Sequence, residues 1–513
     1  MSAGLRPRRG LAGLATSSTS PCKTSASRAV APRPLSPLSS PAAALQLCTA
    51  CRARQPQQQQ PLNHNMFSSL VLEHGRRKKR GDALTTKASQ VALAKAAAEA
   101  AAISASSSWV LACAAIALVA GAPGIALAHK RRGDAAAAPA RALANMAAAS
   151  LSFLGVGYSL AFAFNSLAPT TFPLRWFGAL DLASMVNVST DALVDGVPEL
   201  AWAALQLAHA VLAAAIAGTP SFRQLQNHRA GGAVSAVFAA LFVAVVYAPI
   251  CRLLWAGGFF ATRWNALDFS GSIVVHVAGG AAAMGYYVFG GTLSARSAKP
   301  AEMAAPLTET TRSAASNAHA IGVALLWLTT LALVGGSTVV AGASAATAIL
   351  STHAAAAAGL LTWQLVDFVF PPTVMPEAEG ARGMDATMHT SLGAVAGLAA
   401  ASGVAGFITV NGGILIGIVA AAAARIVRGM GAGAVHCMGG AAGAILLGLV
   451  ASPAAPFYGT GTPLTAASQT GVQIATVCLT FAYSFVVGGL CAFVGAVVGA
   501  VFGGGNGGDA GVI

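Results

Sequence analysis

Charged side chains are scarce in this chain. Asp, Glu, Lys and Arg make up 9% of its 513 residues, whereas 56% of the residues are hydrophobic. Soluble domains carry about a quarter of their residues as charged side chains, so a soluble globular fold is excluded. The composition predicts instead a polytopic membrane protein that sits in a lipid bilayer.

Acidic residues are absent from the first 72 positions. From Met1 to Leu72 the chain is rich in Arg, Ser, Thr, Ala and Pro, a composition typical of an organellar transit peptide. Residues 1–107 hold 15 basic and 3 acidic residues, which leaves 15 and 13 for the rest of the chain. The extension therefore carries +12 of the formal charge of +14, the rest of the chain carries only +2, and no nucleic-acid partner is expected. The basic run Arg76–Arg80 either binds anionic lipid or is a solvated charge run.

Signals for disulfides, metal sites and enzymes are also missing. Five of the eight cysteines lie in apolar segments and three in the basic extension, so they form no disulfide framework. Cys48-Thr-Ala-Cys51 has no second CxxC or nearby HxxxH to complete a zinc site. The apolar segments contain no paired carboxylates, nucleophile elbow or phosphate loop. We therefore expect no metal, no cofactor and no enzymatic activity.

Long apolar runs dominate the rest of the chain. A helix that crosses a bilayer needs about 20 mainly apolar residues, and eleven segments meet this criterion: 108–129, 143–168, 198–217, 232–255, 271–293, 316–340, 343–368, 388–407, 412–428, 434–452 and 473–502. The sequence predicts an all-α membrane domain over 108–502, between the extension 1–107 and a short Gly-rich end, 503–513. Strong helix formers over 87–105 predict a helix that leads into the first span. Most loop Lys and Arg residues fall on one side, which predicts that the C-terminus is inside and that the first span starts outside.

One pattern occurs twice in the apolar region. Val275–Ala282 reads VHVAGGAA and Val435–Ala442 reads VHCMGGAA. Chance recurrence in an Ala- and Gly-rich chain is one explanation. Ionisable groups at bilayer depth are costly, however, at about 2.5–3.5 kcal/mol for Asp, Lys or Arg. One histidine at matching places in two halves favours an internal repeat whose halves meet at a shared site.

The segment around the first histidine resembles the ammonium transporters of the Amt/Mep/Rh group. Ala266–His276 reads ALDFSGSIVVH, close to the ALDFAGGTVVH signature of that family, and Leu254–Gly258 reads LWAGG before it. Weaker matches follow in family order at Pro123–Leu127, Gly157–Phe162, Gln206, Gly335–Ser337 and Ala434–His436. The resemblance covers about residues 108–502. It implies eleven transmembrane helices, an inverted five-plus-five repeat around a central pore, and a homotrimer with one pore in each subunit.

The resemblance also implies roles for particular residues. His276 and His436 would meet edge to edge in a narrow apolar pore and relay a proton; the alternative is two unrelated core histidines, each bonded to backbone carbonyls. Trp255 would stabilise a cation with its ring face in the outer vestibule, where a simple interfacial Trp is the alternative. Ser337 would accept a hydrogen bond from ammonium, unless it serves small-residue packing. Asp268 would hold this recruitment site, a role compatible with a helix N-cap.

Several positions depart from the family pattern. The family gates its pore with stacked aromatic rings, whereas the corresponding positions here are Leu205 and His209 on the third span and Leu333 and Thr330 on the sixth. Trp327, one turn earlier, is a candidate substitute. His209 places an additional imidazole at the pore entrance, or, if the alignment slips by one turn, faces lipid or a neighbouring segment. The usual Asp before the second histidine is Gly431, and Cys437 replaces the Gly after it.

The sequence thus predicts a protein that moves ammonium or ammonia across a membrane. The altered gate and the missing Asp keep open a non-conducting ammonium sensor or structural relative, and the Rh branch suggests a gas channel. The transit-like extension favours a plastid or other organellar membrane, whereas the plasma membrane is the usual location of the family.

Overall fold

The structure is a computed structural model that describes residues 83–129, 137–163, 178–224, 231–294, 309–370, 382–458 and 465–503. The predicted transit peptide, the Arg76–Arg80 run, the Cys48–Cys51 pair and most of the Gly-rich end lie outside these residues.

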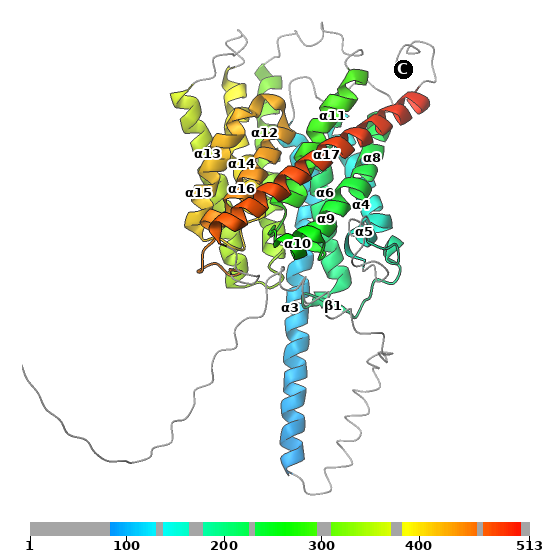
Figure 1. Cartoon of the computed structure of the whole chain (residues 1–513), viewed down its shortest axis with the longest axis vertical. Coiled ribbons are helices and arrows are strands. Elements are labelled where there is room, and N and C mark those ends of the chain that lie inside the picture. Colours follow the sequence, from blue (N-terminus) through cyan, green and yellow to red (C-terminus); the bar gives the residue numbers. More distant parts are fainter. Residues whose placement is uncertain are drawn as a thin grey trace, which may run out of the picture. The chain divides into compact units, whose positions relative to one another are not determined.

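The described residues are almost entirely helical (Figure 1). The first half contains α3 (Ala83–Ala128), α4 (Ala137–Ser152), η1 (Phe153–Gly157), α5 (Tyr158–Phe162), η2 (Ala183–Met185), α6 (Glu199–Ala217), α7 (Thr219–Gln224), α8 (Gly231–Phe242), η3 (Val243–Tyr247), α9 (Ala248–Trp255), α10 (Phe259–Trp264), η4 (Ser272–Val277) and α11 (Ala278–Ser294). The second half contains α12 (Glu309–Gly336), α13 (Ala343–Val369), α14 (Arg382–Ser402), α15 (Val410–Ile426), η7 (Arg428–Met430), α16 (Ala432–Val450) and α17 (Ala466–Gly503).

Each of the eleven predicted spans corresponds to a helix or to a continuous helical run. Within the described residues, nine helices are long and apolar enough to cross a membrane, and Ser391–Ser402 and Val410–Ile426 are two shorter apolar helices. The 17 residues of α15 reach about 25 Å at about 1.5 Å per residue, near the lower limit for a bilayer core. The all-α membrane fold is confirmed.

Two boundaries differ from the prediction. The helix expected over 87–105 is continuous with the first span, so that α3 runs unbroken for 46 residues. All of its residues from Gln90 to Ala102 are exposed, and Ser106 is the first buried residue after them. The second span ends at Phe162 rather than at 168.

A small β-hairpin is the exception to the helical fold among the described residues. The strands β1 (Leu193–Val194) and β2 (Val197–Pro198) pair antiparallel around Asp195 and Gly196. Both turn residues have positive φ, 54° and 86°, as a two-residue type I′ turn requires. The hairpin leads directly into α6, whose side chains line the core.

The core of the bundle is formed by α6, the η4–α11 segment and α16. α6 is buried along nearly its whole length, from Glu199 to Ala217. It contacts α11 and η4, and α16 packs against η4 and α11 from the second half of the chain. α17 crosses α11, α16 and α8 obliquely and closes this side of the bundle (Figure 1). This packing brings the two copies of the repeated pattern together.

Candidate functional site: a buried histidine chain beside a hydroxyl cluster

His276 and His436 contact each other in the middle of the bundle. Their Nδ1 atoms lie 3.1 Å apart, and their ring planes differ by 11° with centroids 5.2 Å apart. Because nitrogens rather than ring faces make the closest approach, the rings meet edge to edge. They are 2% and 0% exposed. Each imidazole therefore has the other as a hydrogen-bond partner in a site without bulk water.

Glycine lets the two helices come close enough for this contact. A Cβ on Gly440 would lie 2.5 Å from the carbonyl oxygen of Ser272 and 3.0 Å from the Cβ of His276. At a second contact between α16 and α11, a Cβ on Gly433 would lie 3.0 Å from the carbonyl oxygen of Gly280. Since His436 lies between these two contacts on α16, its side chain is directed at η4.

The local backbone around His276 is also unusual. η4 is a π-helix, in which the amide of His276 donates to the carbonyl of Gly271, five residues earlier, at 3.0 Å. Gly271 has φ 106°, a backbone conformation that residues other than glycine rarely adopt. Insertions of this kind in helices are frequent at functional sites, and here the wider turn sets the direction of the imidazole.

Asp268 holds the start of this π-helix. Its carboxylate accepts hydrogen bonds from the amides of Gly271, Ile273 and Val274 at 3.1, 3.0 and 2.8 Å. These are amides that a helix start leaves without intrahelical partners. The side chain is 8% exposed. Asp268 thus makes the N-cap contacts that the sequence suggested and, through them, positions the segment that carries His276.

A hydroxyl and aromatic cluster lies at the start of η4. The Oγ of Ser337 donates to the Oγ of Ser270 at 3.0 Å, and His209 Nε2 lies 3.0 Å from the same Ser270 oxygen. The ring of Trp255 contacts His209 edge-on, with centroids 5.2 Å apart. The indole N–H of Trp255 donates to the carbonyl of Asp268 at 2.7 Å. The residues expected in a vestibule are therefore neighbours.

The hydrogen-bond directions in this cluster follow from a backbone carbonyl. His209 Nδ1 lies 3.0 Å from the carbonyl oxygen of Leu205, which can only accept, so Nδ1 carries the proton. In a neutral ring Nε2 then accepts from Ser270. The single proton of the Ser337 hydroxyl has two acceptors within reach, the Leu333 carbonyl at 2.8 Å and the Ser270 oxygen at 3.0 Å. The oxygen of Ser337 keeps lone pairs with which it can accept from an N–H donor.

The altered gate positions lie in the core, but only one of them joins this cluster through its side chain. His209 is 1% exposed and contacts Trp255 and Ser270, so it faces the interior rather than lipid. Leu205 and Leu333 are 0% and 1% exposed and supply apolar surface. The hydroxyl of Thr330 donates within α12 to Leu326.

Trp327, the candidate substitute for a gate aromatic, is placed elsewhere. Its ring contacts His353 of α13, with centroids 5.2 Å apart. His353 is exposed and lies outside the histidine chain. The indole of Trp327 therefore packs at the contact between α12 and α13.

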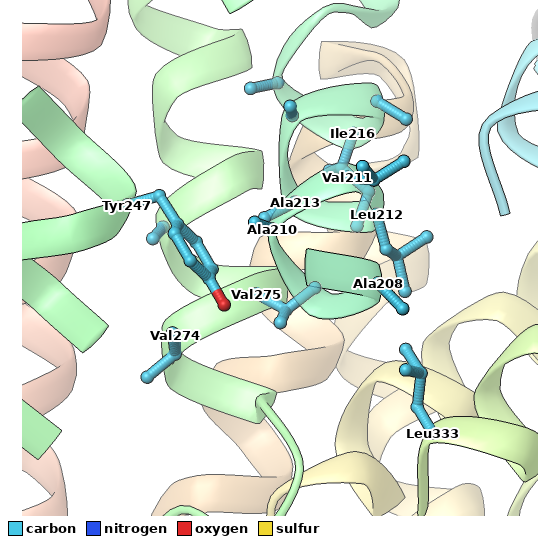
Figure 2. Close-up of a cluster of buried hydrophobic side chains, with 14 of the residues drawn as sticks. Ala208, Ala210, Val211, Leu212, Ala213, Ile216, Tyr247, Val274, Val275 and Leu333 are labelled. Carbon is cyan, nitrogen blue, oxygen red and sulfur yellow. The ribbon is translucent and has the colours of Figure 1, made fainter. Parts of the chain in front are cut away.

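Apolar side chains surround the histidines and the cluster. Figure 2 shows Ala208, Val211, Leu212 and other α6 residues beside Val274 and Val275 of η4, with Leu333 of α12 nearby. In such surroundings an unpaired ion is strongly disfavoured. Among the described residues, no group of three or more His, Cys, Asp or Glu side chains is arranged to hold a metal ion.

The sequence reasoning did not include His129. This residue follows the last residue of α3, and its Nε2 lies 3.1 Å from His436 Nε2. In the sequence it directly precedes Lys130-Arg131-Arg132 and so resembles part of a basic cluster at the end of a span. Only the packing of α3 against the other helices shows that it faces the interior.

Fold and site together define a polytopic helical membrane protein whose dry core holds connected imidazoles next to a hydroxyl cluster. The sequence model of the Ammonium Transporter Family matches residues 108–501. The chain belongs to the Ammonium Transporter Family, as the ALDFSGSIVVH segment predicted. Membership places it among transport proteins rather than enzymes.

Individual relatives agree with this assignment. The ammonium transporter Amt1 of Archaeoglobus fulgidus is 28% identical over 401 residues, which cover 74% of this chain and 89% of that protein. The crystal structure of Candida albicans Mep2 matches with a TM-score of 0.61 at 25% identity, over 75% of this chain and 83% of that one. A structure named Sensor Amt Protein matches with a TM-score of 0.62 at 19% identity, covering 77% and 94%, and supports the fold alone.

Proposed function

We propose that this chain transports ammonium by separating it into ammonia and a proton. The observation that carries the proposal is the Nδ1 to Nδ1 contact of 3.1 Å between His276 and His436 in the dry core. A bare cation would lose its hydration there at a cost of several kcal/mol or more. Ammonium can avoid this cost by giving up a proton, which a metal cation cannot do.

The hydroxyl cluster is suited to receive the cation. The lone pairs of Ser337 accept an N–H of ammonium, and the ring of Trp255 offers its electron-rich face. Trp255 is held in place by its hydrogen bond to the Asp268 carbonyl. Ammonia then moves along the apolar side chains of α6 and η4 while His276 and His436 pass the proton, since a neutral imidazole accepts at one nitrogen and donates at the other.

A growth and uptake assay tests the proposal. The mature chain is expressed in a yeast strain that lacks its own ammonium uptake, with surface amount measured on the same cells. We expect growth at low ammonium, and loss of uptake when His276→Ala removes one ring. The matched control is His353→Ala, which removes an exposed imidazole outside the site. Absence of growth with the wild-type protein at the surface contradicts the proposal.

The same protein in liposomes separates the remaining alternatives. Ammonium binding without flux would favour a sensor, and flux without charge movement would favour a gas channel.

We also propose that the chain assembles as a homotrimer in an organellar membrane. Exposed apolar side chains on α13 and α15, such as Leu361, Leu365, Leu415 and Ile418, offer surface for lipid or for another subunit. The acid-free extension supports organellar targeting. Native mass spectrometry of the purified protein should give a mass of three chains. Imaging of a C-terminal tag and sequencing of the mature N-terminus should locate the membrane and the cleavage site.

A further inference from the structure

His436 is engaged at both ring nitrogens. Its Nδ1 lies 3.1 Å from His276 Nδ1, and its Nε2 lies 3.1 Å from His129 Nε2. The rings of His129 and His436 meet at 75° with centroids 5.2 Å apart, so the contact is between edges. His129 is 7% exposed. Three imidazoles therefore form one series, with His436 in the middle.

The backbone fixes His129 in this position. Its amide donates to the carbonyl of Ile125 at 3.2 Å, which completes the last turn of α3. α12 packs directly onto this turn, since a Cβ on Gly322 would lie 2.1 Å from the amide nitrogen of Ala128. The close contact between α3 and α12 thus determines where the His129 ring lies in the core.

Ser402 closes the opposite end of the series and leaves both hydrogen-bond directions available. Its Oγ lies 2.8 Å from the carbonyl of Leu398 and 3.3 Å from His276 Nε2. When the hydroxyl donates to Leu398, it accepts from His276 Nε2, and the N–H groups then point from His129 through His436 to His276. When the hydroxyl turns to His276, every N–H in the series points the other way. A hydrogen-bonded chain needs both directions to pass successive protons.

We propose that His129 is a third link of the proton relay, so that the proton passes on from His436 to His129 and is not exchanged at His436. A proton that reaches His436 Nδ1 has no other exit, because His436 Nε2 is bonded to His129 and the ring is fully buried. The inference rests on the proposed function and adds the imidazole to which His436 passes the proton.

The transfer balances at each ring. An N–H bond of ammonium breaks as one forms at His276 Nε2, and ammonia is released. His276 Nδ1 gives its proton to His436 Nδ1, and His436 Nε2 gives its proton to His129 Nε2. His129 Nδ1 then gives its proton to ammonia or water. The three rings end neutral with reversed tautomers, and the Ser402 hydroxyl then donates to the Leu398 carbonyl. When the rings return to their first tautomers, this hydroxyl turns back to His276 Nε2.

Charge movement and substrate flux in proteoliposomes separate this role from a structural one. We compare wild type with His129→Gln, whose amide can hydrogen-bond but not relay a proton, and His129→Glu, whose carboxyl can accept and release one. Because each ammonia is released only when its proton enters the relay, current and ammonia flux should fall together about 100-fold in His129→Gln, the lower end of what a positioned proton-transfer group contributes. His129→Glu should recover part of both. His353→Gln is the matched control and should leave both unchanged.

The other outcomes contradict the inference. Normal current and flux in His129→Gln mean that protons leave at His436. The same loss in His129→Gln and His129→Glu means that His129 is only structural, because the carboxyl then restores nothing. If wild type carries neither substrate nor charge, the proposed function itself fails, and the relay with it.

A readout independent of transport follows the same contacts. In protein labelled with ¹⁵N at histidine, nitrogen couplings across the hydrogen bonds should link His276 to His436 and His436 to His129. Only the second link should disappear in His129→Gln. Absence of the second link in wild type would overturn the proposal even in an active transporter.

Discussion

The capping of η4 by Asp268 provides the strongest test of how the site is held. Its carboxylate accepts three backbone N–H groups at 3.1, 3.0 and 2.8 Å and is 8% exposed. In Asp268→Ala all three donors lose their acceptor, and each buried donor without a partner costs about 1–3 kcal/mol. Removal of a desolvated carboxylate offsets part of this loss. We expect a net destabilisation of about 3 kcal/mol.

Asp268→Asn gives a graded second point. The amide oxygen can still accept from Ile273 and Val274, whereas the NH₂ group faces the amide of Gly271. One hydrogen bond is lost and two weaken, for which we expect about 1–2 kcal/mol. Asp191→Asn is the control, because this exposed carboxylate should change stability by no more than about 0.5 kcal/mol. Stabilities are measured by SDS titration in mixed micelles.

The cap also determines the histidine contact. Without it, η4 can relax toward a regular α-helix, in which the amide of His276 no longer donates to Gly271, and the ring turns away from His436. We expect the ¹⁵N coupling between the two rings and the ammonium current to fall together in Asp268→Ala. If this variant unfolds at the same SDS fraction as Asp191→Asn and keeps the coupling, the account of η4 is wrong.

Three further predictions concern other contacts. Gly440→Val places a side chain against the Ser272 carbonyl, so it should cost about 1–3 kcal/mol in the same titration and abolish transport; Gly429→Val, in open space, should not. His209→Leu leaves the buried Ser270 hydroxyl without its acceptor and should cost about 1–3 kcal/mol, and a double-mutant cycle with Ser270→Ala should show that their effects are not additive. Burial raises the pKa of the Asp195 carboxyl from 3.8 to about 7, so folding favours its protonated form. Hairpin stability should fall as the pH rises from about 4 to 7. Asp195→Asn should remove this pH dependence, measured as the protection of the amides of residues 193–197 from hydrogen exchange.

The fold and part of the site could be read from the chain alone. Hydrophobic length fixes the spans, because a bilayer admits few structures besides apolar helices, and the predicted helices correspond to those of the structure. The ALDFSGSIVVH segment was sufficient to indicate the family. His276 and His436 could be paired in advance because they recur in the same local pattern.

Side-chain direction could not be derived in this way. Trp327 was a candidate substitute for a gate residue because it lies one turn before the family position, but its ring contacts His353. His209 had two possible directions, and its contacts with Ser270 and Trp255 decide between them. The π-helix at Ser272–Val277 has no clear signal beyond the glycine that precedes it, yet it sets the angle of the imidazole of His276.

The sequence by itself determined a membrane-spanning helical protein of the ammonium transporter family, because hydropathy and a local motif are properties of neighbouring residues. Only the tertiary structure decided that His129 joins His276 and His436. These three side chains come from α3, η4 and α16, and close helix packing through glycine brings their rings within hydrogen-bond distance. Contact between residues so distant along the chain depends on how helices cross, which no local pattern specifies.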